Sequence, residues 1–144
     1  MDRGAYCLIM RLGVGKEIEA GRRPSVRFPK GYYCYVGSAM GGLEKRISRH
    51  LSREKRLRWH IDFFLEHARI VDVIRIESKE RLECALSRKV EALSDCSPAK
   101  GFGSSDCLCR SHLHHFRENP ARSIEKMVRK WKNSLGNTGR EGKR

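Results

Sequence analysis

Apolar residues along the chain recur with two periods, one typical of strands and one of helices. Residues 4–12, GAYCLIMRL, and 31–37, GYYCYVG, are apolar and aromatic runs that begin at glycine, which is typical of strands. Because a single connection joins them, an antiparallel hairpin is the simplest pairing. Residues 70–77, IVDVIRIE, are apolar on both alternating faces except at Asp72 and Arg75, which predicts a central strand covered on two sides. The pattern therefore predicts about three strands.

Four other segments carry apolar residues at helical spacing. The pattern predicts helices over 43–56, 59–68 and about 80–94. Asn119-Pro120 then offers an N-cap and a first-turn proline for a basic amphipathic C-terminal helix within 117–132. Together with the strands, these helices predict an α+β fold with a small, mainly antiparallel central sheet flanked by helices.

The remaining segments are expected to be connections and a tail. Residues 13–30 contain three glycines and two prolines, which predicts a connection with one short strand edge around 25–28. Residues 95–111 are rich in Gly, Ser and Cys and predict a loop. After Lys132 the chain reads NSLGNTGREGKR, which has nothing to bury, so 133–144 is expected to be a disordered basic tail.

Composition narrows the class of partner. The chain has 144 residues, 39% of them hydrophobic, which is enough for one domain with a core. Its 31 Lys and Arg against 17 Asp and Glu give a net charge of +14, which favours a polyanion: nucleic acid first and an anionic membrane surface second. Because no run of 18 or more apolar residues is present, we expect no membrane span and a cytoplasmic protein.

Short motifs follow one another in a recognisable order along this framework. Gly4-Ala5-Tyr6 lies in the first strand, Tyr35-Val36-Gly37 in the second, Arg46 and His50 on the next helix, and Glu83 on a later helix. This order resembles the GIY-YIG nuclease superfamily. The stretches RHLSREKRLRWHIDFFL and GFGSSDCLCRSHLHHF are similar to a compact, mainly archaeal branch of that superfamily.

The resemblance covers roughly residues 4–116, so a GIY-YIG-like nuclease domain is expected over 1–116. The two motifs stand further apart here than is usual in the superfamily. Tyr6 and Tyr35 are 29 positions apart, which requires an insertion at 13–30. The superfamily's terminal asparagine motif is also missing from its usual place.

The resemblance implies a metal-dependent endonuclease that hydrolyses phosphodiester bonds in DNA or structured nucleic acid, as in repair or recombination. In that reaction Tyr6 would orient or deprotonate the attacking water, and Tyr35 would assist at the phosphate. Arg46 would clamp the transferring oxygens, and His50 would contact phosphate or shuttle a proton. Glu83 would hold one divalent cation, magnesium or manganese.

Without the resemblance, each of these residues also has a structural interpretation. Tyr6 and Tyr35 could be core residues of strands with their hydroxyls at the rim. Arg46 could belong to a solvated cationic face, and Glu83 could be a surface carboxylate of a helix.

Two basic helices are expected to supply affinity for phosphates that does not depend on sequence. The residues predicted to contact nucleic acid are Arg49, Arg53, Lys55, Arg56, Arg58, Lys126, Arg129 and Lys130.

A second cluster, DCLCRSHLHH, combines thiols and imidazoles. The six cysteines of such a chain are expected to be reduced thiols or metal ligands rather than a disulfide framework. Cys107, Cys109, His112 and His115 could bind zinc, although C-x-C spacing is tighter than usual. The alternative is structural, with Cys107 in a small core site and the histidines near the nucleic-acid surface.

Two other functions compete with the nuclease. A non-catalytic nucleic-acid-binding module on the same fold predicts binding that survives removal of Glu83. A zinc-stabilised interaction protein predicts stoichiometric zinc and loss of folding with chelators.

Overall fold

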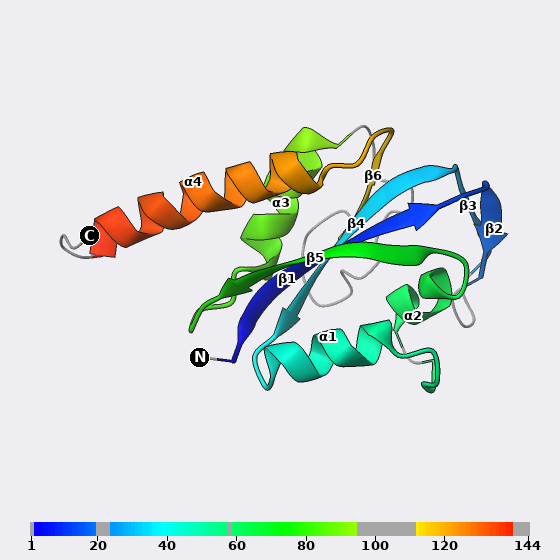
Figure 1. Ribbon diagram of the computed structural model, residues 1–144, viewed down its shortest axis with the longest axis horizontal. Coiled ribbons are helices and arrows are strands. Elements are labelled where there is room, and N and C mark those ends of the chain that lie inside the picture. Colours follow the sequence, from blue (N-terminus) through cyan, green and yellow to red (C-terminus); the bar gives the residue numbers. More distant parts are fainter. Residues whose placement is uncertain (1, 20–23, 58, 95–111, 140–144) are drawn as a thin grey trace.

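The computed structural model describes residues 2–19, 24–57, 59–94 and 112–139 (Figure 1). The strands are β1 Gly4–Leu12, β2 Lys16–Ile18, β3 Val26–Phe28, β4 Gly31–Ala39, β5 Arg69–Glu77 and β6 Leu113–Phe116. The helices are α1 Leu43–Leu51, α2 His60–Leu65, α3 Glu83–Leu93 and α4 Ala121–Gly139. The main sheet is antiparallel and has helices on both sides, so the predicted small α+β fold is confirmed.

The two glycine-bounded runs form the centre of the main sheet. The sheet is four-stranded with the order β5-β1-β4-β6, and β1 pairs with β4 from Gly4 opposite Ala39 to Leu12 opposite Gly31. The predicted antiparallel pairing of these runs is therefore confirmed. The connection between them holds a second, two-stranded sheet of β2 and β3, which includes the short strand expected around 25–28.

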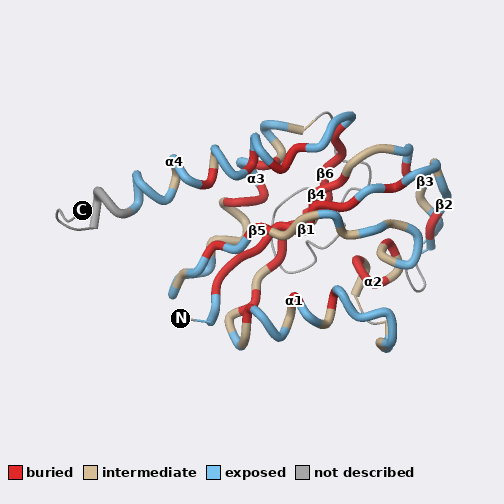
Figure 2. The backbone as a smooth tube through the Cα atoms, in the orientation of Figure 1, coloured by how far each residue is buried: buried red, intermediate tan, exposed pale blue. Residues whose placement is uncertain are grey.

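Alternate residues of the central strands fill two separate cores. On one face, Leu8 and Met10 pack with the apolar residues of α1 and α2. On the other face, Cys7 and Ile9 pack with those of α3 and α4. Figure 2 shows the buried residues concentrated along β1 and β4, between the two helical layers. Both helical layers are needed because the middle of this sheet is apolar on both faces.

The prediction that 70–77 forms a central strand was wrong about its place in the sheet. β5 is an edge strand that pairs with β1, and the register shifts between Ile9 and Met10 of β1. Residues Arg69, Val71, Arg75 and Glu77 are exposed along it. A run of branched apolar residues suits an edge strand that is buried on alternate positions as well as a central one, so composition alone does not separate the two.

The sheet has one strand more than predicted. β6 adds Leu113–Phe116 beside β4, with Tyr32 opposite Phe116 and Tyr35 opposite Leu113. The pattern missed it because the segment reads LHHF, and histidine is a weak signal for strands. All four residues are nonetheless buried.

Three helices end at other residues than the pattern predicts, and one of them is α2, which ends at Leu65 rather than at 68. α1 ends at Leu51 rather than at 56, because Ser52 takes an extended conformation and the Lys55 ammonium bonds the last free carbonyl groups. α4 continues to Gly139, beyond the predicted end at Lys132, so residues 133–139 are helical and not a disordered tail. Residues 140–144 lie outside the described part of the chain.

Candidate active site

The site begins with a close approach between the two central strands. Tyr6 of β1 lies directly opposite Gly37 of β4. A Cβ atom at position 37 would lie 2.4 Å from Tyr6 Cζ and Oη, so only glycine leaves room for this ring. Tyr35 lies on the same face of β4, with its ring centroid 6.5 Å from that of Tyr6. The glycine of the second motif thus makes space for the tyrosine of the first.

α1 brings a histidine onto this pair of rings. Gly42 precedes the helix with a φ of 152°, a backbone conformation that favours glycine, and Leu43, Ile47 and His50 form the buried side of the helix. His50 Nε2 lies 2.7 Å from the Tyr6 hydroxyl oxygen. The His50 ring centroid is 5.4 Å from that of Tyr6 and 6.2 Å from that of Tyr35.

Burial sets the protonation states of this group. It lowers the pKa of His50 to about 4, with Asp62 opposing, so the imidazole is neutral at pH 7. It also raises the pKa of the Tyr6 hydroxyl, although Arg46 opposes this shift. The pKa of Tyr35 is raised as well, by burial first and then by the charges of Tyr6 and Glu83. A neutral His50 can therefore accept a hydrogen bond from a protonated Tyr6.

Arg46 lies beside these rings and is held from two sides. Its Nη1 donates to the Ser38 carbonyl oxygen at 2.9 Å, and its guanidinium carbon is 4.6 Å from the centroid of the Trp59 ring. Arg49 also lies over Trp59, at 4.2 Å. Because the cation–π contacts and the carbonyl leave other guanidinium N–H groups free of these partners, Arg46 can bind an anion beside Tyr6.

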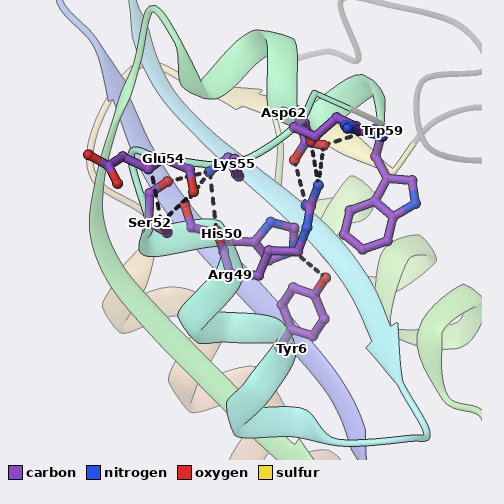
Figure 3. A network of polar contacts seen from close by, with 9 residues as sticks. Tyr6, Arg49, His50, Ser52, Glu54, Lys55, Trp59 and Asp62 are labelled. Atoms are coloured by element: carbon purple, nitrogen blue, oxygen red, sulfur yellow. Dashed lines mark hydrogen bonds and ion pairs between the residues drawn. The ribbon is translucent and has the colours of Figure 1, made fainter.

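Asp62 organises the outer part of the site, as Figure 3 shows. Its carboxylate accepts two hydrogen bonds from Arg49, at 2.9 and 3.0 Å, and one from the Trp59 backbone N–H at 2.9 Å. Arg49 also donates to the Arg56 carbonyl oxygen at 2.8 Å. These bonds tie α1 to the start of α2 and fix Trp59 over the two arginines.

Glu83 enters from the first residue of α3. One of its carboxylate oxygens lies 2.8 Å from His112 Nδ1, and its side chain is 26% exposed while that of His112 is 2% exposed. The His112 carbonyl oxygen accepts the Val36 N–H at 2.9 Å, which holds His112 beside β4. The charge of Glu83 contributes to the raised pKa values of Tyr6 and Tyr35, so the carboxylate acts on both hydroxyls.

All five predicted catalytic residues thus belong to one neighbourhood, although they come from four elements. β1, β4, α1 and α3 supply Tyr6, Tyr35, Arg46 with His50, and Glu83, respectively.

The residues predicted to contact nucleic acid fall into two groups: some are engaged within the protein and others are exposed. Arg49 is engaged by Asp62, and the Lys55 ammonium donates to the carbonyl oxygens of Arg49, His50 and Ser52, so both side chains have structural roles. Arg53 and Arg56 are exposed, whereas Arg58 lies outside the described residues. The three remaining cations, Lys126, Arg129 and Lys130, are exposed on α4, which packs on the other face of the sheet from α1 (Figure 1).

The two described members of the thiol–imidazole cluster do not converge. His112 contacts Glu83, whereas His115 Nε2 contacts the Lys30 carbonyl oxygen at 3.1 Å and its ring packs against Tyr33. Cys107 and Cys109 lie outside the described residues. Across 2–19, 24–57, 59–94 and 112–139, no group of three or more His, Cys, Asp or Glu side chains is placed to hold a metal ion.

Sequence reasoning missed the roles of Trp59 and His112. Trp59 supports Arg46, and its only signal was Asp62 three residues later, at a spacing that suits a helix N-terminus. His112 is the partner of Glu83, whereas the sequence indicated either a zinc ligand or a histidine near the nucleic-acid surface, because its neighbours in the sequence are Cys and His.

Fold and site together define a small α+β protein with a tyrosine–histidine–arginine cluster on an antiparallel sheet. The chain belongs to the family described as "Domain of unknown function DUF123", whose model matches residues 5–133. That match extends from β1 into α4. No curated protein and no solved structure matches the chain. In the described part of the chain, every helix is too short or too polar to cross a membrane.

Proposed function

We propose that this protein is a divalent-metal-dependent endonuclease that hydrolyses phosphodiester bonds in DNA or structured nucleic acid. The observation that carries the proposal is the convergence of a tyrosine hydroxyl on a neutral histidine, beside an arginine and near a carboxylate. The resemblance of the GAY and YVG motifs to the GIY-YIG superfamily supports it, as does the net charge of +14.

Tyr6 and His50 would form the proton path. A phenol with a raised pKa is a poor base by itself, so Tyr6 needs a partner that takes its proton. His50 Nε2 lies 2.7 Å away and is neutral at pH 7, so it is open to accept that proton. Because burial holds its pKa near 4, the negative charge of a bound phosphate would have to raise that pKa while Tyr6 accepts a proton from the attacking water. The path begins at the attacking water, passes through Tyr6 Oη and ends on the imidazole.

Arg46 and Tyr35 would bind the phosphate. The pentacoordinate transition state carries additional charge on its oxygens, and a guanidinium placed beforehand stabilises that charge without reorganising. Arg46 is placed in this way by Ser38 and Trp59. Tyr35 stays protonated because burial raises its pKa, so it would donate a hydrogen bond to a phosphate oxygen.

The chemistry of Glu83 fits a magnesium or manganese ion. It supplies hard carboxylate oxygens, it is half-buried, and its Oε2 contacts His112. Such an ion usually takes one or two protein carboxylates and completes its shell with water and substrate phosphate. When bound, it would supply charge neutralisation at the phosphate and the leaving oxygen. His112 would hold the carboxylate in position for it.

The test is cleavage of a panel of labelled substrates, namely single-stranded, duplex, flapped and branched DNA and RNA, with and without magnesium or manganese. Glu83→Ala is compared with the wild type and with Glu80→Ala, which removes an exposed carboxylate three residues earlier. We expect metal-dependent cutting by the wild type and by Glu80→Ala, and none by Glu83→Ala. Salt-sensitive binding by all three proteins without cutting would contradict the proposal and favour a non-catalytic module.

A further inference from the structure

A concave region lies beside the end of α1, and His50 is among the residues that line it. It is a hollow of about 770 Å³ between the end of α1, residues 52–57, the end of α2 and the start of β5. We call it the α1–β5 hollow. His50 lines it, so the hollow adjoins the Tyr6 cluster. Its volume is in the range of pockets that hold small organic ligands.

Three arginines without anionic partners line this hollow. Arg11 and Arg69 stand directly opposite each other on β1 and β5, an arrangement of like charges that destabilises a sheet. Arg53 is exposed on the segment after α1. Within the described residues, no carboxylate lies within ion-pair distance of any of these three guanidinium groups. The hollow therefore has free positive charge for an anionic ligand.

The other charged groups of the lining already have partners. Asp62 is paired with Arg49, and the Lys55 ammonium donates hydrogen bonds to three backbone carbonyl groups. Glu66 is the remaining acidic residue of the lining. Three arginines against one glutamate leave an excess of positive charge, so the hollow favours anions.

The lining also has an apolar wall. Leu51 is 55% exposed, and Leu57 and Leu65, which line the same hollow, are half-buried. An inorganic anion has no apolar surface that could pack against these leucines.

We propose that the α1–β5 hollow binds one unpaired nucleotide of the substrate strand, next to the phosphate that is cut. The base would lie against the leucine wall, and the arginines would bind its phosphate. A free nucleoside monophosphate has the same chemistry. This inference rests on the proposed function for the position of the cut, and it adds a substrate class: nucleic acid with an unpaired nucleotide beside the scissile bond, as in flaps and branches.

Titration calorimetry on the intact chain tests the site without any cleavage. The probes are deoxyadenosine 5′-monophosphate, deoxyadenosine and inorganic phosphate. The variants are Arg53→Gln and, as matched control, Arg122→Gln, an exposed arginine on α4. We expect the nucleotide to bind more tightly than either fragment, Arg53→Gln to weaken it about tenfold, and Arg122→Gln to leave it unchanged.

A second experiment distinguishes binding of a nucleotide within a strand from binding of a free nucleotide. In the Glu83→Ala background, which removes the proposed metal ligand, we compare binding of a duplex with one unpaired nucleotide to binding of the perfect duplex. If the duplex with the unpaired nucleotide binds more tightly, and Arg53→Gln abolishes this difference, the result supports binding of a nucleotide within a nucleic-acid strand. A preference for the free nucleotide alone would make this a small-molecule site and overturn the substrate class.

Other results would also overturn the assignment. Equal losses in Arg53→Gln and Arg122→Gln would indicate non-specific charge, and phosphate binding as tightly as the nucleotide would indicate a plain anion site. These outcomes are independent of the nuclease proposal. Nucleotide binding that depends on Arg53 could be found in a protein that never cuts, and cutting could be found in a protein whose hollow binds no nucleotide.

Discussion

At the scale of single residues, the site depends on contacts between side chains that the backbone brings unusually close. Tyr6 and His50 are 44 positions apart in the chain, yet their polar atoms are 2.7 Å apart. The contact exists because Gly37 has no side chain and because α1 ends its buried face with a histidine. Each of these features can be tested by one substitution.

Tyr6→Phe should abolish most of the cleavage while the protein stays folded. The substitution keeps the ring that fills the core and removes the hydroxyl that would relay the proton, so we expect kcat to fall by about a hundredfold to ten-thousandfold. Tyr32→Phe is the matched control, because Tyr32 lies on the same strand as Tyr35 and packs with the opposite core. Single-turnover cleavage measures both variants, and equal rates for Tyr6→Phe and wild type would refute the relay.

Gly37→Ala should destabilise the fold and displace Tyr6. The added Cβ would lie 2.4 Å from the Tyr6 ring, which is pressed against His50, so neither side can give way easily. We expect a loss of about 1–3 kcal/mol in the free energy of unfolding, measured with urea. Gly41→Ala is the control, because a Cβ there meets no atom within 4 Å. A loss of the same size at both positions would argue against a specific contact with Tyr6.

Two buried histidines should make the protein less stable in acid. Burial lowers the pKa of His50 to about 4, and burial together with the neighbouring His112 lowers the pKa of His114 to about 4. Between the ordinary value of 6.5 and about 4, the unfolded chain binds protons that the folded chain does not. The free energy of unfolding therefore falls as the pH falls through that window.

The linkage between proton binding and folding also gives the size of this loss of stability in acid. Each histidine contributes a slope of at most about 1.4 kcal/mol per pH unit. Around His50, Lys55, Arg46 and Arg49 also lower the pKa, and Asp62 opposes them. Urea denaturation between about pH 7 and about pH 5 measures the slope. His114→Gln, whose side-chain amide reaches the position of Nε2 and can still bond Ser87, should reduce it, and a stability that does not change with pH would contradict the prediction.

At the scale of elements, Asp62 joins α1 to α2 and thereby determines where Trp59 and Arg46 lie. The carboxylate is fully buried, and it accepts bonds from a helix before it and from the backbone at the start of its own helix. Lys55 and Arg56 hold the first part of the connection against α1, and Asp62 fixes Trp59 at the start of α2. The position of Arg46 is therefore a property of this junction as well as of α1.

Asp62→Asn should accordingly loosen the junction. It removes the charge that pairs with Arg49 and keeps the shape, and we expect a loss of about 1–3 kcal/mol because Arg49 is partly exposed to water and can be resolvated. Glu66→Gln is the control, since Glu66 is exposed at the end of the same helix. Urea denaturation measures stability, and near-ultraviolet circular dichroism reports on Trp59. No change in either quantity for Asp62→Asn would contradict the prediction.

At the scale of the whole molecule, positive charge lies on both sides of the sheet. α1 and the segment after it carry cations beside the Tyr6 cluster, whereas α4 carries Lys126, Arg129 and Lys130 on the far face. A long nucleic acid that meets both would have to extend around the domain. The two surfaces should therefore contribute to affinity separately, and only the first should affect the chemistry.

Replacing these three α4 cations by glutamine should weaken nucleic-acid binding and leave kcat at saturating substrate unchanged. Each phosphate contact that is lost should reduce the dependence of log affinity on log salt by about 0.9 for duplex DNA. Binding isotherms across a salt series measure this slope. Lys79→Gln, at the turn before α3, controls for a simple loss of charge. A lower kcat in the triple variant would place α4 in the catalytic machinery and contradict this separation.

The sequence by itself determined the outline of the protein. Alternating and helical periods predicted β1, β4, the four helices and the antiparallel α+β class, because these elements bury one face or two faces with regular spacing. The order of Tyr6, Tyr35, Arg46, His50 and Glu83 was also visible, since motifs in sequence order need no knowledge of distance.

Only the tertiary structure decided which of these residues meet and which are occupied elsewhere. Four features depend on contacts between segments that are far apart in the chain. These are the edge position of β5, the addition of β6, the ion pair of Arg49 with Asp62 and the contact of His112 with Glu83. Propensity and periodicity describe how one segment presents its own faces. They hold no information on which distant segment covers each face, and that is decided by the packing of the whole chain.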